Sequence, residues 1–235
     1  MRAFLNPPGC AAAGNVRIVL LGPPGAGKGS LAFLWEERLG VPHLSTGEIF
    51  RHEIAKRTPL GRRVHAYVAS GQLVPDPLVV QVMASRLTPE KLAKGFVLDG
   101  FPRTQAQAAG LSRVLRKRKA PLDAAVALTS PEPLLVRRLS GRRVCGRCGA
   151  NYHLRTMRPK RSGRCDRCQG KLIVRKDDEP VTIRKRLAID RRASSPLLRY
   201  YQRAGLLHRM DGRGHIETVF NRSLKLLRRK GWLRA

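Results

Sequence analysis

Three short apolar runs recur along the chain, at residues 16–21, 96–99 and 124–128, and the first contains several β-branched residues. Stretches with helical character separate them. Apolar runs of this length are typical of buried strands, and their alternation with helices predicts a parallel sheet. We therefore expect an α/β fold in which helices flank the sheet. With 235 residues and 42% apolar content, the chain can bury one sizeable core.

The first apolar run leads directly into a glycine-rich loop. The segment "VRIVLLGPPGAGKGS" (residues 16–30) continues into an amphipathic helix. Strand, glycine-rich loop and helix in this order predict a phosphate-binding loop, and so a P-loop NTPase-like fold. Backbone N–H groups turn toward phosphate oxygens, the helix directs its positive end at them, and Lys28 adds a charge. The general motif has Ser or Thr directly after the lysine, whereas here Gly29 precedes Ser30.

Four of the five cysteines form two CxxC pairs, Cys145 with Cys148 and Cys165 with Cys168, separated by 16 residues. This spacing matches the template for tetrahedral zinc. Four thiolates close the coordination sphere, so we expect a structural Zn²⁺ and a reducing compartment. Many Arg and Lys residues surround the pairs, against one acid, Asp166. A zinc ribbon that binds nucleic acid is therefore the alternative.

Further motifs follow in a fixed order: "LSTGEIFR" (44–51), "GQLVPDPLV" (71–79), "GFVLDGFPRT" (95–104), "RRLSGRRVC" (137–145) and "RKDDEPVTIRKRL" (175–187). Together with the glycine-rich loop, they make about residues 16–220 resemble the adenylate kinase family. The cysteine segment resembles the long zinc-bearing lid of that family. The resemblance implies a P-loop NTPase-like parallel sheet with two inserts, a helical NMP-binding insert and the zinc lid.

The resemblance also implies an activity: reversible, Mg²⁺-dependent phosphoryl transfer from ATP to AMP, giving two ADP, by a monomeric enzyme unit. Such chemistry needs positioning and charge neutralisation, which converging guanidinium groups supply. By resemblance, ATP would be bound by Gly25, Gly27, Lys28, Gly29, Ser30, Arg138 and Arg142, and AMP by Thr46, Arg51, Arg103 and Gln107. The catalytic set would be Lys28, Arg103, Arg138, Arg142, Arg175 and Arg186. Asp99 would position Mg²⁺ through water.

We expect the chain to divide accordingly. The core kinase domain would comprise residues 16–44, 75–140 and 179–220, with the NMP-binding insert at 45–74 and the zinc lid at 141–178. Residues 221–235 would form a basic C-terminal tail. Residues 1–15 are expected to be a small leader, with an organellar targeting remnant as the alternative. The sequence contains no apolar run of about 18 residues, so it predicts no transmembrane segment.

The net charge is extreme: 47 Lys and Arg against 16 Asp and Glu, a formal +31. Most of the excess lies in residues 100–235. Self-repulsion of this size disfavours a compact monomer unless a polyanion neutralises it. We therefore hypothesise that the protein works while bound to RNA, with a ribosomal particle, particularly an organellar one, as the leading candidate. This predicts a mitochondrial matrix or other organellar location, with the cytoplasm as the alternative.

Other readings of the charge stay open at this point. The positive charge could instead serve binding to an anionic membrane surface. It could also reflect a genome whose GC-rich coding favours arginine, in which case the charge implies no partner. A structural RNA-binding ribosomal subunit on an adenylate kinase scaffold, with vestigial or retained activity, is the alternative function. The basic residues that exceed the needs of a lid, and where we expect RNA first, are Arg155, Arg158, Lys160, Arg161 and Arg164.

Overall fold

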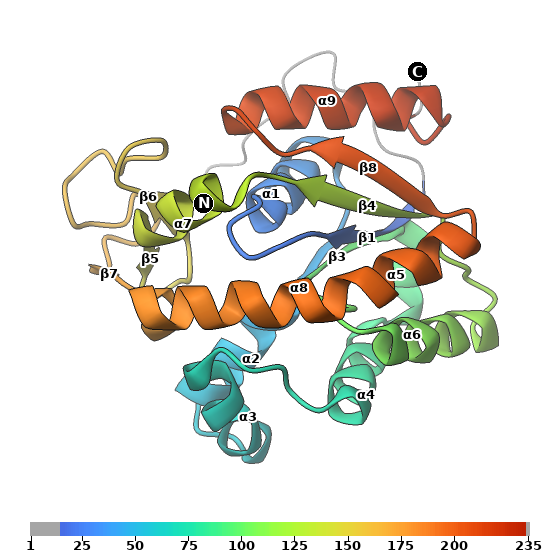
Figure 1. Ribbon diagram of the computed structural model, residues 1–235, viewed down its shortest axis with the longest axis horizontal. Coiled ribbons are helices and arrows are strands. Elements are labelled where there is room, and N and C mark those ends of the chain that lie inside the picture. Colours follow the sequence, from blue (N-terminus) through green and yellow to red (C-terminus); the bar gives the residue numbers. More distant parts are fainter. Residues whose placement is uncertain (1–14, 234–235) are drawn as a thin grey trace.

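The computed structural model describes residues 15–233 and confirms the P-loop NTPase-like α/β fold (Figure 1). Five parallel strands form the central sheet in the order β2-β3-β1-β4-β8. Three of them lie on the predicted apolar runs. The strands are β1 (Arg17–Leu21), β2 (His43–Ser45), β3 (Phe96–Asp99), β4 (Ala124–Thr129) and β8 (Leu207–Asp211).

Both faces of β1 are buried, which explains its unbroken apolar run. Ile18 and Leu20 face the core cluster built with α1 and α9. Val19 and Leu21 face the opposite cluster, built with α4 and α6. The central strand therefore places the loop that follows it firmly at the carboxyl edge of the sheet, where ligands bind in open α/β folds.

The helices cover both faces of the sheet. The longest, α8, runs along the sheet in Figure 1 and contributes to both core clusters. The helices are α1 (Lys28–Leu39), α2 (Thr46–Ala55), α3 (Pro59–Ser70), α4 (Asp76–Arg86), α5 (Pro89–Lys94), α6 (Gln105–Lys117), α7 (Glu132–Ser140), α8 (Pro180–Arg203) and α9 (Ile216–Arg229), with a 3₁₀ turn η1 (Lys176–Asp178).

Two excursions leave this core. The first is the pair α2 and α3, which lies below the sheet in Figure 1. The second, residues 141–178, is called the lid segment below; it carries a small antiparallel sheet in the order β6-β5-β7. Its strands are β5 (Arg142–Cys145), β6 (Asn151–His153) and β7 (Leu172–Ile173).

The end of the described chain is a packed helix. Leu226 and Leu227 of α9 are buried in the core, and Trp232 packs against the same cluster. Arg228 and Arg229 are exposed on the same helix. The expected basic tail therefore begins inside α9, and the expected leader lies outside the described residues except for Asn15. No helix within residues 15–233 is long and apolar enough to cross a membrane.

Candidate active site

The glycine-rich loop wraps around the Lys28 ammonium group. Gly25 and Gly27 adopt φ angles of 83° and 96°, a region that favours glycine. Lys28 Nζ donates to the carbonyl oxygens of Gly22 (2.6 Å) and Pro23 (3.0 Å). Burial lowers the pKa of Lys28, against the opposing influence of nearby carboxylates. The loop thus holds one partly buried cation at the start of α1, where a phosphate would meet it.

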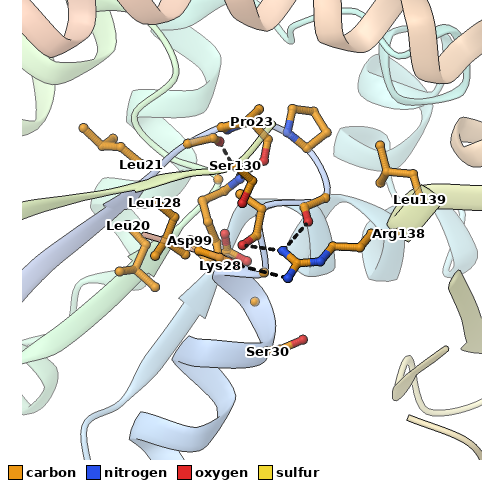
Figure 2. A pocket seen from close by; sticks show the side chains of 18 of the residues that line it. Leu20, Leu21, Pro23, Lys28, Ser30, Asp99, Leu128, Ser130, Arg138 and Leu139 are labelled. Carbon is orange, nitrogen blue, oxygen red and sulfur yellow. Dashed lines mark hydrogen bonds between the residues drawn. The ribbon is translucent and has the colours of Figure 1, made fainter. Parts of the chain in front are cut away.

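Gly29 accounts for the departure from the general motif. A Cβ atom at Gly29 would lie 3.0 Å from Asp99 Oδ2, at the end of β3. The missing side chain lets the Asp99 carboxylate lie directly against α1, beside Lys28 (Figure 2). Because Asp99 lines the cavity described below, its carboxylate fits the expected role of holding Mg²⁺ through water.

Behind Asp99 lies a histidine that the sequence did not single out. His43 Nε2 is 3.9 Å from Asp99 Oδ2, too long for a direct hydrogen bond. This nitrogen is buried and has no hydrogen-bond partner among the described residues. Burial opposes protonation of His43, but the Asp99 carboxylate outweighs it and raises the histidine pKa above 6.5. Burial likewise opposes ionisation of Asp99, yet His43 and Lys28 hold its pKa below 3.8.

A cavity of about 440 Å³, the main cavity, lies over the glycine-rich loop. Its lining contains eight basic side chains and three acidic ones, so it is built for an anion. Most of the residues assigned by resemblance come together here: Gly25, Gly27, Lys28, Gly29, Ser30, Arg51, Asp99, Arg103, Arg138, Arg142, Arg175 and Arg186.

Two carboxylates of η1 balance the arginines at the base of the lid segment. Arg142 donates to both Asp178 oxygens, with Nε 2.6 Å from Oδ2. Arg186 lies 3.0 Å from Asp177 Oδ2 and 3.1 Å from Asp178 Oδ1. We call these four residues the hinge cluster. The carboxylates hold both guanidinium groups beside the cavity.

Arg175 lies near the hinge cluster, but fewer hydrogen bonds and ion pairs balance its charge. Its Nη2 donates to Asn151 Oδ1 at 2.9 Å, while its buried Nε has no hydrogen-bond partner in the described part of the chain. Burial, reinforced by the charges of Arg51 and Arg142, lowers the Arg175 pKa to about 9. An under-compensated cation that lines a cavity favours an anionic partner there.

Arg138 occupies a different environment from the other arginines. Its Nη2 donates to the carbonyl oxygens of Gly212 and Gly214, both at 3.0 Å. Its Nη1 lies 3.5 Å from the Gly25 oxygen and 3.4 Å from that of Ala26. Figure 2 shows this side chain reaching the glycine-rich loop. Arg138 therefore ties that loop to the turn after β8, in addition to lining the cavity.

Thr46 and Gln107 line a smaller adjoining cavity of about 80 Å³, which Arg51 and Arg103 also line. Both side chains are almost fully buried and already hold protein partners. Thr46 Oγ1 donates to the Gly100 carbonyl at 2.9 Å. Gln107 accepts the Arg103 N–H and donates to Asp76, both at 2.8 Å. They shape this second cavity as well as offering polar atoms to it.

The four predicted metal ligands converge in the lid segment. The sulfur atoms of Cys145, Cys148, Cys165 and Cys168 all lie within 4.8 Å of one another. Four thiolates around Zn²⁺ at about 2.3 Å place the sulfurs just under 4 Å apart, so the set fits a structural zinc. Burial opposes ionisation of Cys165, but the Tyr152 hydroxyl and backbone N–H donors lower its pKa to about 6. His153 lies outside the cluster.

Three acidic residues lie close to Lys28 and to the arginines of the cavities, and the sequence analysis did not single them out. Asp177 and Asp178 form part of the quoted "RKDD" motif, which was the available signal. Asp190, one helical turn after Arg186 on α8, also lines the main cavity. Burial raises the Asp190 pKa, against the charges of Lys28, Arg103 and Arg186. No local pattern marked Asp190, because its role depends on which face of α8 meets the cavity.

A parallel sheet, a glycine-rich loop opening α1 and a basic cavity above that loop define a nucleotide-binding protein of the P-loop class. Comparison with known proteins narrows this class. The family model described as adenylate kinase matches residues 20–206. The adenylate kinase of Clostridium tetani (strain Massachusetts / E88) is 45% identical over 205 residues, covering 87% of this chain and 95% of the relative.

Two further relatives agree. The adenylate kinase of Clostridium botulinum (strain 657 / Type Ba4) is 44% identical over 91% of this chain and 99% of its own length. The adenylate kinase of Moorella thermoacetica is 46% identical over 87% of this chain and 94% of its own length. The chain belongs to the adenylate kinase family, as the motifs predicted, and is a nucleoside monophosphate kinase of the type that uses Mg²⁺.

Proposed function

We propose that the protein transfers a phosphoryl group reversibly from ATP to AMP, giving two ADP. The observation that carries this proposal is the convergence on one cavity of a cradled lysine and seven arginines from segments far apart in the sequence. ATP phosphates would lie against Lys28 and the lid arginines, and the AMP phosphate against Arg51 and Arg103. Bound Mg²⁺ would neutralise phosphate charge, and Asp99 would hold it through water.

Closure of the lid segment and of α2–α3 would exclude water, so that AMP rather than water accepts the phosphoryl group. The hinge cluster supports this part of the proposal. Its arginines pair with Asp177 and Asp178, and phosphate oxygens offer them the same bidentate partner. Nucleotide binding would thus exchange one set of anions for another.

Replacing Lys28 with alanine tests the reaction. Because Lys28 is the cation that the loop holds over the cavity, we expect Lys28→Ala to lower kcat/KM at least about a hundredfold in an assay of ADP formation. Lys94→Ala is the matched control, since that lysine is exposed and, among the described residues, forms an ion pair only with Glu90 on the same helix. A Lys28→Ala protein as active as wild type would refute the proposed site.

We also propose that this kinase works while bound to RNA. The particle to test first is a ribosome, either in an organelle or in the cytoplasm. The supporting observation is a basic face of the lid segment without ion pairs. Within the described chain, no carboxylate forms an ion pair with the exposed residues Arg155, Arg158, Lys160, Arg161 and Arg164, which we call the lid basic face. Asp166 beside them accepts the Lys160 backbone N–H.

RNA binding of this kind should depend steeply on salt, with a slope of about −0.7 to −0.9 per phosphate contact. We expect serine at positions 155, 158, 161 and 164 to weaken RNA binding and flatten this slope. The control removes the same number of charges from exposed residues of the α6 end: Arg113, Arg116, Lys117 and Lys119. Equal losses in both variants would argue against the lid basic face, and release from RNA below physiological salt would refute RNA binding.

The same experiment addresses the alternative of a ribosomal subunit with vestigial activity. Ribosome co-sedimentation without ADP formation would favour that alternative. ADP formation by a protein that stays bound to RNA would favour an active enzyme in a ribonucleoprotein particle. Binding to vesicles with anionic headgroups, but not to RNA, would assign the charge to a membrane surface instead.

A further inference from the structure

A single aromatic contact connects the zinc-binding turns to the helix of the phosphate loop. The guanidinium carbon of Arg167, between Cys165 and Cys168, lies 4.4 Å from the centroid of the Phe33 ring. This separation is well inside the range of a cation–π interaction. Within residues 15–233, no hydrogen bond or ion pair joins residues 145–148 or 165–168 to a residue outside the lid segment.

Both partners of this contact are held in place. Phe33 lies in α1, five residues after Lys28, and its ring packs against the core cluster built with α1 and α9. The Arg167 backbone N–H donates to Cys165 Sγ at 3.4 Å, so the metal-ligand cluster fixes the base of this side chain. A continuous path therefore runs from the thiolates through Arg167 and Phe33 to the helix that begins at Lys28.

We propose that Arg167 is a positioning residue that holds the lid segment against α1 while ATP is bound. This inference rests on the proposed kinase function, in which the lid must close over the phosphates. The contact stabilises the closed arrangement without touching a nucleotide. Because Phe33 and Lys28 share α1, closure through this contact also fixes the lid relative to the phosphate loop.

The chain contains its own control for this proposal. Arg147 occupies the same position in the first turn, Cys145-Gly-Arg-Cys148, as Arg167 does in the second. Its backbone N–H also donates to a ligand sulfur, Cys145 Sγ, at 3.4 Å. Arg147 is exposed and makes no contact with an aromatic ring within the described chain. Arg147→Ala therefore removes the same charge from an equivalent turn.

The test compares Arg167→Ala, Phe33→Leu and Arg147→Ala in steady-state kinetics. We expect Arg167→Ala and Phe33→Leu each to raise the ATP KM about two- to fivefold, the range that a partly exposed cation–π contact supports. The AMP KM and kcat should stay near wild type, or kcat should rise where lid opening limits turnover. Arg147→Ala should match wild type, and Phe33→Tyr, which keeps the ring, should restore the ATP KM.

The zinc content and the thermal midpoint of each variant distinguish a folding defect from a lost contact. Only variants with wild-type zinc content and a wild-type thermal midpoint enter the kinetic comparison. The double variant Arg167→Ala/Phe33→Leu should resemble either single variant, since both remove one interaction. Fully additive effects, or an Arg167→Ala protein that behaves like Arg147→Ala, would overturn the proposal.

A second measurement does not depend on turnover. Amide hydrogen exchange with a non-hydrolysable ATP analogue should protect the lid segment in wild type and Arg147→Ala, and protect it less in Arg167→Ala. If wild type forms no ADP but shows this difference, the proposed reaction fails and the contact stands. If wild type forms ADP but all three proteins show equal lid protection, the contact fails and the reaction stands.

Discussion

Arg142 and Asp178 pair across the base of the lid segment, through two hydrogen bonds from one guanidinium group to both oxygens of one carboxylate. Arg142 begins β5 and Asp178 ends η1, so the pair joins the two ends of the lid. The Asp178 side chain has no exposed surface. Since Arg142 is also proposed to bind ATP phosphates, the carboxylate and the nucleotide share one guanidinium partner.

Replacing Asp178 with asparagine should destabilise the nucleotide-free protein. The change removes the buried counter-charge of Arg142 and leaves Arg186 with Asp177 alone, so we expect the free energy of unfolding to fall by about 3 kcal/mol. Saturating ATP should reduce this loss, because its phosphates supply the missing negative charge. Urea unfolding with and without ATP measures both effects.

Asp166→Asn is the control for this prediction. Asp166 is an exposed carboxylate of the same lid segment that accepts the Lys160 backbone N–H. Its replacement should change stability by no more than about 0.5 kcal/mol. An Asp178→Asn protein that loses the same stability with and without ATP would show that phosphates do not take over the role of the carboxylate.

Removing a metal ligand should unfold the lid segment while the core stays folded. Its own buried cluster consists of Cys145, Tyr152 and Cys165, too little to hold about 38 residues without a metal. We expect one zinc per chain by elemental analysis, lost in Cys165→Ser. Hydrogen exchange in that variant should accelerate within residues 141–178. The fifth cysteine gives the control: Cys10→Ser should retain the zinc.

A side chain at Gly29 should disturb the proposed magnesium site. The Cβ atom of Gly29→Ala would lie 3.0 Å from Asp99 Oδ2, so the carboxylate has to move. Misplacement of this size should lower kcat/KM by about tenfold to a hundredfold and raise the Mg²⁺ concentration needed for half-maximal activity. In the control Gly146→Ala, the new Cβ would meet Ile173 at an ordinary 3.6 Å. A Mg²⁺ requirement unchanged from wild type in Gly29→Ala would contradict the assignment of Asp99.

His43 should make stability depend on pH. Its folded pKa is raised above 6.5 by Asp99, so the native state holds the proton more tightly than the unfolded chain does. The stabilisation is therefore fully present below about pH 6.5 and is lost as the pH rises through the folded pKa. Urea unfolding of wild type and His43→Gln from about pH 5 to pH 8 should show wild type losing its advantage at the upper end. His65→Gln, at an exposed position on α3, controls for loss of an imidazole.

An advantage of wild type over His43→Gln that grows with pH would contradict this prediction. It would mean that the neutral imidazole, rather than the Asp99–imidazolium pair, stabilises the fold. Asp99→Asn provides an independent check, since it should lower the His43 pKa measured by NMR titration.

Local chemistry in the sequence determined much of the site and of the fold. The glycine-rich loop, the two CxxC pairs and the buried strands at β1, β3 and β4 each carry their signal within a few residues. Backbone freedom, ligand spacing and apolar runs depend on near neighbours, so each was predictable. The short β2 and the mixed β8 carried no such signal, because their places in the sheet depend on β3 and β4 as partners.

Only the tertiary structure decided which charges face one another. That Asp178 neutralises Arg142, that Asp190 faces the lysine of the loop, and that Arg167 rather than Arg147 meets an aromatic ring all depend on the packing of distant segments. In sequence, the two arginines of the CxxC turns are equivalent. Charge interactions act through space and strengthen where water is excluded, so the fold, rather than the local sequence, selects the partners of each side chain.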